Sequence, residues 1–208
     1  MNNSFKYSIV LSSIKELSKQ LMGNSFDHGF PHIIRVYKWA YRIVENEKLR
    51  NYINTFILDA SIYLHDVGRL VGEPHAYYSA VIARGLLKEH NVPDSMIEKI
   101  CNAILTHSYS YMKRHNIKPE SIEAQILSDA DKLDALGIVG FIRVFNYSVT
   151  RNRSYKDTIK HFYDKIFKLK NYMYFPYSRK VAEELTEKTL KILEDLANEL
   201  GPEFYIDY

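Results

Sequence analysis

The chain has 208 residues, of which 46% are hydrophobic and 25% are charged, a balance that is typical of one globular domain and excludes a disordered chain. The formal net charge of +3 is too small to indicate a nucleic-acid-binding protein by itself. The single cysteine, Cys101, excludes an internal disulfide and a multi-cysteine metal site, and we expect it to be a small buried residue.

Apolar residues recur at spacings of three and four along nearly the whole chain, and the chain has only 8 Gly and 6 Pro. This pattern predicts an all-α fold with long helices. In chain order, we expect helices at residues 5–21, from Pro31 onward, 54–69, 76–90, 93–107, 122–136, 137–152, 155–169 and 179–200. We predict a single domain over residues 1–208, with a core that carries the motifs at 20–145 and a helical C-terminal extension at 146–208.

The sequence also predicts the cellular location of the protein. The N-terminus is polar, and no apolar run approaches the length that a membrane-spanning helix needs. We therefore expect a cytoplasmic protein without a membrane partner. Tyr205 and Tyr208 would permit contact within a homo-oligomer, although they do not argue for one.

Four polar residues occupy positions of the helical pattern where apolar residues are expected. They are His32, His65, Asp66 and Asp131. His32 shares a helix face with Val36 and Ile43, and Asp66, next to His65, shares one with Leu58 and Ile62. Asp131 shares a face with Leu127 and Ala135. Burying a carboxylate without a partner costs several kcal/mol, so buried carboxylates usually meet a cation. Each position alone is weak, because a buried His is more often a hydrogen-bonded core residue and a helical Asp is more often a cap or a solvated charge.

Taken together, the two imidazoles and two carboxylates form a suitable ligand set for one divalent ion. Neutral nitrogen ligands favour Mn, Fe, Co, Ni or Zn, and the two anionic oxygens balance the charge of the ion. Mg stays an alternative. Coordination positions left to water would supply a nucleophile, because a bound divalent ion lowers the pKa of that water.

Three segments carry a resemblance to a known family. They are DHGFPHIIRV at 27–36, LHDVGR at 64–69 and SDADKLDALG at 128–137. In this order they resemble the HD-domain superfamily of metal-dependent phosphohydrolases, whose pattern is His, then His-Asp, then Asp. The resemblance implies an HD-type helical bundle with a central metal-binding cavity. It also implies that His32 is the first ligand, His65 and Asp66 are the signature pair, and Asp131 is the last ligand.

Within this superfamily the chain is most similar to the small bacterial and archaeal HD hydrolases, some of which cleave nucleotides. It lacks the Glu-Asp pair that follows the signature in guanosine tetraphosphate hydrolases and the Gly-Tyr-Pro element of cyclic dinucleotide phosphodiesterases. The resemblance implies that a metal-bound hydroxide hydrolyses a nucleotide or another small phosphate ester or anhydride. Two alternatives stay open: a nuclease-like phosphohydrolase that acts on nucleic acid, and a catalytically silent helical module that binds a nucleotide or a partner protein.

Two more histidines, His75 and His107, lie on apolar helix faces between the signature pair and Asp131. Some HD families with two metals place additional histidines in similar segments. The resemblance therefore allows a second ion at His75 and His107, with Asp66 as the bridge. The alternative is a single ion, with both histidines contacting phosphate or packing in the core.

A phosphorylated substrate also requires cationic contacts and a proton acceptor. We predict Arg69, one turn after the signature pair, and Lys132, directly after Asp131, as phosphate contacts. Glu73 is the nearest carboxylate after Asp66 and a candidate base, and His107 is another. The basic segment 143–170 could cover a nucleotide or bind nucleic acid, but we favour an ordinary solvated helix face.

Overall fold

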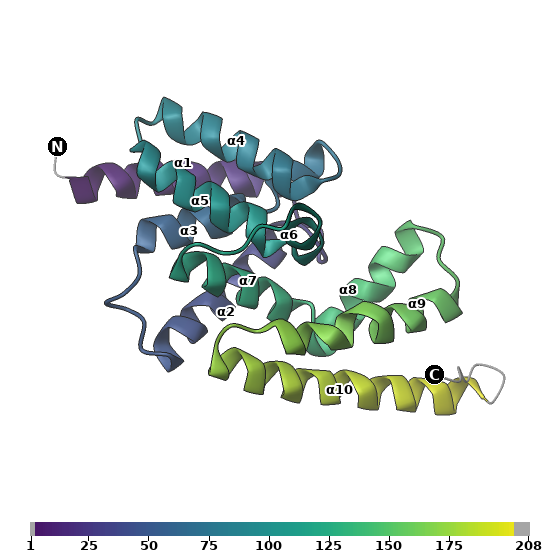
Figure 1. Cartoon of the computed structure of the whole chain (residues 1–208). Helices are drawn as coiled ribbons and strands as arrows, with labels where there is room; N and C mark the ends of the chain where they lie inside the picture. The colour runs from purple at the N-terminus through teal and green to yellow at the C-terminus, as the bar shows by residue number, and fades with distance from the viewer. Residues whose placement is uncertain (1–2, 202–208) are drawn as a thin grey trace. The chain divides into compact units, whose positions relative to one another are not determined.

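A computed structural model of the chain describes residues 3–201; Tyr205 and Tyr208 lie outside the described residues. Over this range the regular structure is helical throughout and contains no strand (Figure 1). The all-α fold predicted from the spacing of apolar residues is thereby confirmed. The chain divides into two compact units, Met1–Asp131 and Lys132–Tyr208. The expected organisation, one domain with an extension from residue 146, stays a prediction.

The first unit consists of helices and one short 3-10 helix. They are α1 (Asn3–Met22), α2 (Phe30–Asn46), α3 (Thr55–Leu64), the 3-10 helix η1 (Val67–Leu70), α4 (His75–Glu89), α5 (Asp94–His107), α6 (Tyr109–His115) and the first part of α7 (Ile122–Asp134). Helix α3 contacts α1, α2, α4 and α5, and every residue from Phe56 to Leu64 is buried. A helix that is mostly apolar and buried on all sides suits this central position. The signature pair follows directly at its C-terminal end.

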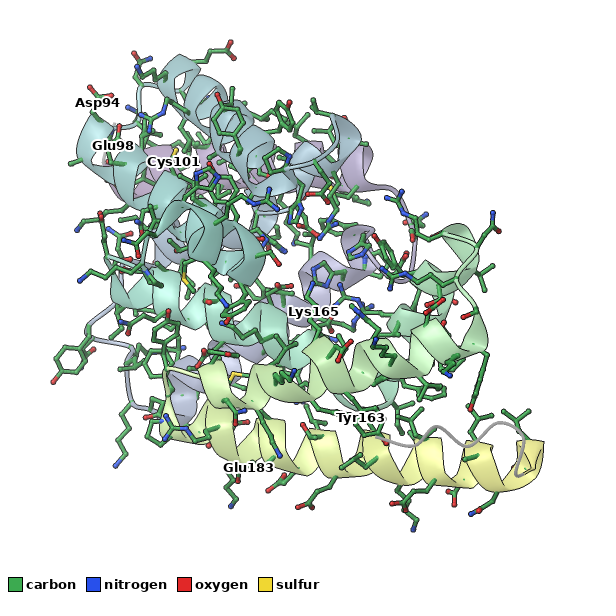
Figure 2. All side chains as sticks on the ribbon, turned by 45° about the vertical axis from the view of Figure 1, so that its right-hand side comes forward. Asp94, Glu98, Cys101, Tyr163, Lys165 and Glu183 are labelled. Carbon is green, nitrogen blue, oxygen red and sulfur yellow. The ribbon has the colours of Figure 1, made fainter. Side chains whose placement is uncertain are left out.

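Helices α4 and α5 pack along each other in the same unit. Figure 2 labels Glu98 and Cys101 on α5. Glu98 pairs with Arg84 of α4, with 2.7 Å between Arg84 Nη2 and Glu98 Oε2, whereas Cys101 is buried and its thiol lies 3.6 Å from Ala80 O. Burial raises the pKa of the Cys101 thiol to about 11. The expectation that Cys101 is a small buried residue is thereby confirmed.

The second unit contains the end of α7 and five further helical elements. They are α8 (Gly137–Thr150), α9 (Tyr155–His161), the π-helix η2 (Phe162–Ile166), the 3-10 helix η3 (Phe167–Tyr172) and α10 (Pro176–Leu200). Helix α10 contacts α8 and η3. Aromatic rings fill much of the interior between α8 and η2, with Phe162 fully buried and its ring centroid 5.9 Å from that of Phe141. Figure 2 labels Tyr163 on η2, and its ring meets that of Phe167 edge-on.

Several helix boundaries differ from the predicted ones. The helix expected at 54–69 ends at Leu64, the one expected at 155–169 becomes α9, η2 and η3, and α6 was not predicted. Helix α6 has seven residues and none is buried, so it carries no apolar stripe that a sequence pattern could reveal. Ile138 continues the helical spacing of Asp131 and Ala135 but is exposed, because α7 ends at Asp134 and α8 begins at Gly137 with a φ of +68°.

No helix among residues 3–201 combines the length and apolar character that crossing a membrane requires.

Candidate metal centre

The signature pair lies at the end of α3 rather than inside a helix. His65 caps α3, Asp66 has a φ of −111° and a ψ of −1°, and the chain continues as η1. The reason is the close approach of η1 to α4: Gly68 N donates to Ser79 Oγ at 2.8 Å, and a Cβ on Gly68 would lie 2.3 Å from His75 O. A continuous helix over 54–69 was therefore a wrong prediction, and the break sets the direction of the Asp66 side chain.

Four predicted residues bring their nitrogen and oxygen atoms together in the first unit. His32 Nε2 lies 3.3 Å from His65 Nε2, 3.7 Å from Asp66 Oδ2 and 3.4 Å from Asp131 Oδ1. His65 Nε2 lies 3.9 Å from Asp66 Oδ2. The side chains of His32, His65 and Asp66 are almost completely buried, whereas that of Asp131 is 26% exposed. Helix α2, the end of α3 and helix α7 thus each contribute to one cluster.

These separations fit a shared cation. Metal–ligand bonds of about 2.1 Å place two ligand atoms about 3.0 Å apart at a right angle and about 4.2 Å apart when they are opposite each other. The three separations among His32, His65 and Asp66, from 3.3 to 3.9 Å, fall within this interval, as does the 3.4 Å between His32 and Asp131. A two-nitrogen, two-oxygen donor set without sulfur suits a divalent ion of the Mn to Zn series.

The histidine tautomers are compatible with ligation. His65 Nδ1 lies 2.8 Å from the carbonyl oxygen of Ile62, and His107 Nδ1 lies 2.5 Å from that of Ile104. A carbonyl only accepts, so in each ring Nδ1 carries the proton that is donated, and Nε2 is the nitrogen that faces the cluster and can bind a cation. A backbone carbonyl that fixes the ring in this way is a common second partner of metal-binding histidines.

The other oxygen of Asp66 faces the second pair of histidines. Asp66 Oδ1 lies 3.4 Å from His75 Nε2 and 3.6 Å from His107 Nε2, and these three residues form a second group with metal-ligand spacing. Oδ1 is buried and makes no hydrogen bond within the described residues. A buried carboxylate oxygen without a partner is costly, so this atom fits contact with a cation.

The charges around the cluster are set by burial and by one arginine. Burial lowers the pKa of His65 to about 3, so this imidazole is neutral at pH 7. Burial alone would raise the pKa of Asp66, but the Arg69 guanidinium holds it well below its usual range. For Asp131 the effect of burial is likewise outweighed, by a hydrogen bond from His32 and by the nearby imidazoles, so its pKa is also well below the usual range. Both carboxyl groups are therefore ionised and available to a cation.

The residues predicted as phosphate contacts have partners of their own. Arg69 Nε donates to Asp66 Oδ2 at 2.6 Å, and its side chain is 28% exposed. Lys132 is buried, and its Nζ lies 5.5 Å from the centroid of the Tyr174 ring. Glu73, the candidate base, is mostly exposed, and its Oε2 accepts from the backbone N of His75 and lies 3.1 Å from His75 Nδ1. This places Glu73 beside His75 as a residue that orients the ring.

One residue near the cluster was not predicted. His28 Nδ1 lies 3.7 Å from Asp66 Oδ2, and the side chain is 28% exposed. His28 precedes the first helical residue of α2, so no helical pattern includes it. Its position four residues before His32 is the signal in the sequence that could have identified it.

The basic segment 143–170 lies in the second unit and is heterogeneous. Arg143 donates to Asp134 Oδ2 at 2.8 Å, and both side chains are largely buried. Arg151 and Arg153 are exposed and lie over the ring of Tyr147, at 5.5 and 5.0 Å. Lys165, labelled in Figure 2, is exposed. The segment therefore combines a structural ion pair with solvated cations.

Comparisons with known proteins agree with this architecture. Bacillus subtilis YpgQ is 28% identical over 193 residues, which cover 86% of this chain and 88% of YpgQ. The crystal structure of Bacillus subtilis YpgQ in complex with ADP superposes with a TM-score of 0.73 at 22% identity, covering 93% of this chain and 96% of the other. An HD-superfamily hydrolase from Bacillus thuringiensis gives a TM-score of 0.67 at 26% identity, covering 95% of this chain and 97% of the other.

The family model described as the HD domain matches residues 29–136. This range includes His32, His65, Asp66 and Asp131, and it spans more than half of the chain. The chain belongs to the HD domain family.

Proposed function

We propose that the protein is a metal-dependent phosphohydrolase that acts on a nucleotide or on another small phosphate ester or anhydride. The observation that carries this proposal is the cluster of His32, His65 and Asp66, whose ligand atoms lie 3.3 to 3.9 Å apart, together with Asp131, whose Oδ1 lies 3.4 Å from His32 Nε2. Membership of the HD domain family supports hydrolysis. The relative from Bacillus thuringiensis is named as an HD-superfamily hydrolase, and the YpgQ structure that contains ADP supports a nucleotide as the substrate.

In this proposal, His32, His65, Asp66 and Asp131 would hold one divalent ion. Such an ion acidifies water to provide a nucleophile and neutralises the charge of phosphate oxygens. The chain's own residues have two tasks. The Ile62 carbonyl keeps the lone pair of His65 on Nε2. Arg69 keeps Asp66 ionised and would also contact a phosphate group bound at the ion.

The second histidine group, His75 and His107, would carry out proton transfer. His75 lies between Asp66 Oδ1 and Glu73, and burial lowers its pKa, so it is a neutral base at pH 7. Glu73 would act on the reaction through the orientation of this ring rather than as the base itself. Lys132 stays a proposed phosphate contact.

A second ion is the alternative role for His75 and His107, with Asp66 as the bridge. Elemental analysis separates the two roles. With one ion, His107→Ala keeps the metal content of the wild-type protein, whereas with two ions it loses about half of the metal. His32→Ala would lose the first ion in either case.

The proposed activity is tested by assaying nucleoside triphosphates, diphosphates and monophosphates and short oligonucleotides with Mn, Co, Ni and Mg. We expect release of phosphate or pyrophosphate from a nucleotide, dependent on the metal and lost in Asp66→Ala. Turnover of oligonucleotides alone would favour the nuclease alternative. Tight metal binding without turnover of any substrate would favour the silent module, and either result would contradict the proposal.

A further inference from the structure

Asp59 is a buried carboxylate of the first unit that lies outside the metal cluster. It is in the middle of α3, about 9 Å along the helix axis from His65, and only 8% of it is exposed. Its Oδ1 accepts a hydrogen bond from Tyr41 Oη at 2.7 Å. Its Oδ2 accepts none from the described residues and is not among their fully enclosed unpaired atoms, so solvent reaches this oxygen. Asp59 therefore presents one oxygen to solvent from an otherwise buried position.

Three tyrosine rings form a continuous stack beside this carboxylate. The ring of Tyr37 stacks on that of Tyr41, with 4.6 Å between the centroids, and on that of Tyr63, with 5.8 Å. Tyr41 contacts Asp59 through its hydroxyl, and Tyr63 is one turn after Asp59 on α3. Tyr63 is buried, whereas Tyr37 and Tyr41 are half-buried and reach solvent. Helices α2 and α3 thus place aromatic rings and a solvent-accessible carboxylate oxygen at one location.

The charge of Asp59 has no cationic partner among the described residues. The nearby cation, Lys15 of α1, is exposed, and its Nζ lies over the Tyr63 ring at 5.9 Å from the centroid rather than on the carboxylate. Burial raises the pKa of Asp59 despite the hydrogen bond from Tyr41, because the charged form is desolvated without a countercharge. A cation bound at Oδ2 would remove this cost.

The combination of one carboxylate oxygen with aromatic rings selects an organic cation. An ammonium or guanidinium group donates N–H bonds to a carboxylate, and its positive charge is also attracted to the negative face of an aromatic ring. The position of Lys15 over Tyr63 shows that a cation already meets one ring of this stack. A divalent metal ion fits less well, because it requires several oxygen or nitrogen ligands and Oδ2 is the one anionic atom available.

We propose that Asp59, Tyr37 and Tyr41 form a binding site for a small organic cation that carries an ammonium or guanidinium group. The cation donates to Asp59 Oδ2 and lies against the tyrosine rings. The site is separate from the proposed metal cluster, and it does not depend on the phosphohydrolase function.

The test titrates the protein with methylguanidinium and, separately, with methylurea, which has a similar shape and N–H donors but no charge. Shifts of the backbone amide resonances of Asp59 and Tyr41 in nuclear magnetic resonance spectra report binding and give the dissociation constant. The same titrations are made with Asp59→Asn and Tyr37→Leu. The matched control is Asp94→Asn, because Asp94 is an exposed carboxylate at the start of α5 in the same unit.

We expect methylguanidinium to shift both resonances in a saturable way, and methylurea to bind about tenfold more weakly or not at all, because the charge is missing. Asp59→Asn should weaken the binding of methylguanidinium about tenfold for the same reason. Tyr37→Leu, which removes one ring of the stack, should weaken it about threefold. Asp94→Asn should bind methylguanidinium as the wild-type protein does.

Three results would overturn the assignment. Unshifted resonances of Asp59 and Tyr41 in the wild-type protein would show that the cation does not bind there. Equal affinity for methylguanidinium and methylurea would show that the site does not select charge. Equal affinity of Asp59→Asn and the wild-type protein for methylguanidinium would show that the carboxylate takes no part. None of these results bears on the metal cluster, so the proposed function is tested separately.

Discussion

Arg69 donates a hydrogen bond from Nε to Oδ2 of Asp66 at 2.6 Å, and this ion pair joins η1 to the end of α3. Asp66 is almost fully buried, whereas Arg69 reaches solvent. The pair lets one carboxylate stay ionised in a buried position while its other oxygen, Oδ1, remains without a hydrogen bond in the described residues. The buried negative charge of Asp66 is therefore available to a cation and lies next to the imidazole rings of the cluster.

Replacing Arg69 with Gln should weaken metal binding in a pH-dependent way. Arg69 holds the pKa of Asp66 well below its usual range, and a carboxyl group must lose its proton to bind a cation. Without Arg69 that pKa rises, so protons compete at acidic pH. We expect the loss of Mn affinity to be larger at pH 5 than at pH 8, because the proton competes with the ion only at the lower pH. Calorimetric titration at both pH values measures this.

The control is Arg84→Gln, because Arg84 also pairs with a carboxylate but lies at the surface with Glu98. It should leave the Mn affinity unchanged at both pH values. An equal loss at pH 5 and pH 8 in Arg69→Gln would contradict the role of Arg69 in keeping Asp66 ionised.

Gly68→Ala should destabilise the protein, because the added Cβ would lie 2.3 Å from His75 O and Ser79 N. Both are backbone atoms, so the close packing of η1 on α4 has to open, at a cost of about 2 kcal/mol or more. Urea denaturation measures the change in the free energy of unfolding. Gly85→Ala, in α4 itself, meets nothing within 4 Å and should stabilise the helix by about 0.5 to 1 kcal/mol. Equal stability of the two variants would refute this account of the break after α3.

Asp59→Asn should make the protein more stable at neutral and alkaline pH. Burial raises the pKa of Asp59 despite the hydrogen bond that Tyr41 donates to it at 2.7 Å. The folded state therefore binds this proton more tightly than the unfolded state does, and stability falls as pH rises from the unfolded pKa through the folded one. Asn keeps an acceptor for Tyr41 without the charge, so the gain above that range should be about 1 kcal/mol.

Thermal unfolding from pH 4 to pH 8 measures this, with the exposed Asp195→Asn as the control. The midpoint difference between Asp59→Asn and the wild type should grow as pH rises. A difference that shrinks with rising pH would show that the Asp59 carboxylate stabilises the fold.

Lys132→Met tests the proposed phosphate contact while keeping the aliphatic bulk of a buried side chain. We expect KM for the nucleotide substrate to rise about tenfold with the metal content unchanged, since a charge-assisted hydrogen bond to phosphate is lost. Tyr174→Leu removes the ring that lies over Lys132 and serves as the comparison. Kinetics of Lys132→Met that match those of the wild type would remove Lys132 from the site.

Much of the architecture was predictable because helices that bury one face have a clear apolar period. Helix α5, predicted at 93–107, is observed at Asp94–His107, and α4, predicted at 76–90, is observed at His75–Glu89. The polar residues at core positions directed attention to His32, His65, Asp66 and Asp131, and in the structure their ligand atoms lie close together. Their role as metal ligands stays a proposal.

Features that depend on contacts distant in sequence were not predictable. The end of α3 depends on the contact of Gly68 with the backbone of α4, which no local pattern encodes. The π-helix η2 continues the period of α9 closely enough to be mistaken for one helix. His28 was missed because it precedes α2, and only the folded segment brings it to Asp66.

The central claim, that the four clustered residues hold a divalent ion, is tested most directly by counting bound metal in Asp66→Asn. After removal of metal with a chelator and reloading with Mn, elemental analysis should find at least one ion per wild-type chain. Asp66→Asn, which keeps the shape of the side chain, should hold none and keep its helical circular dichroism. Full metal content in Asp66→Asn, or none in the wild-type protein, would contradict the account.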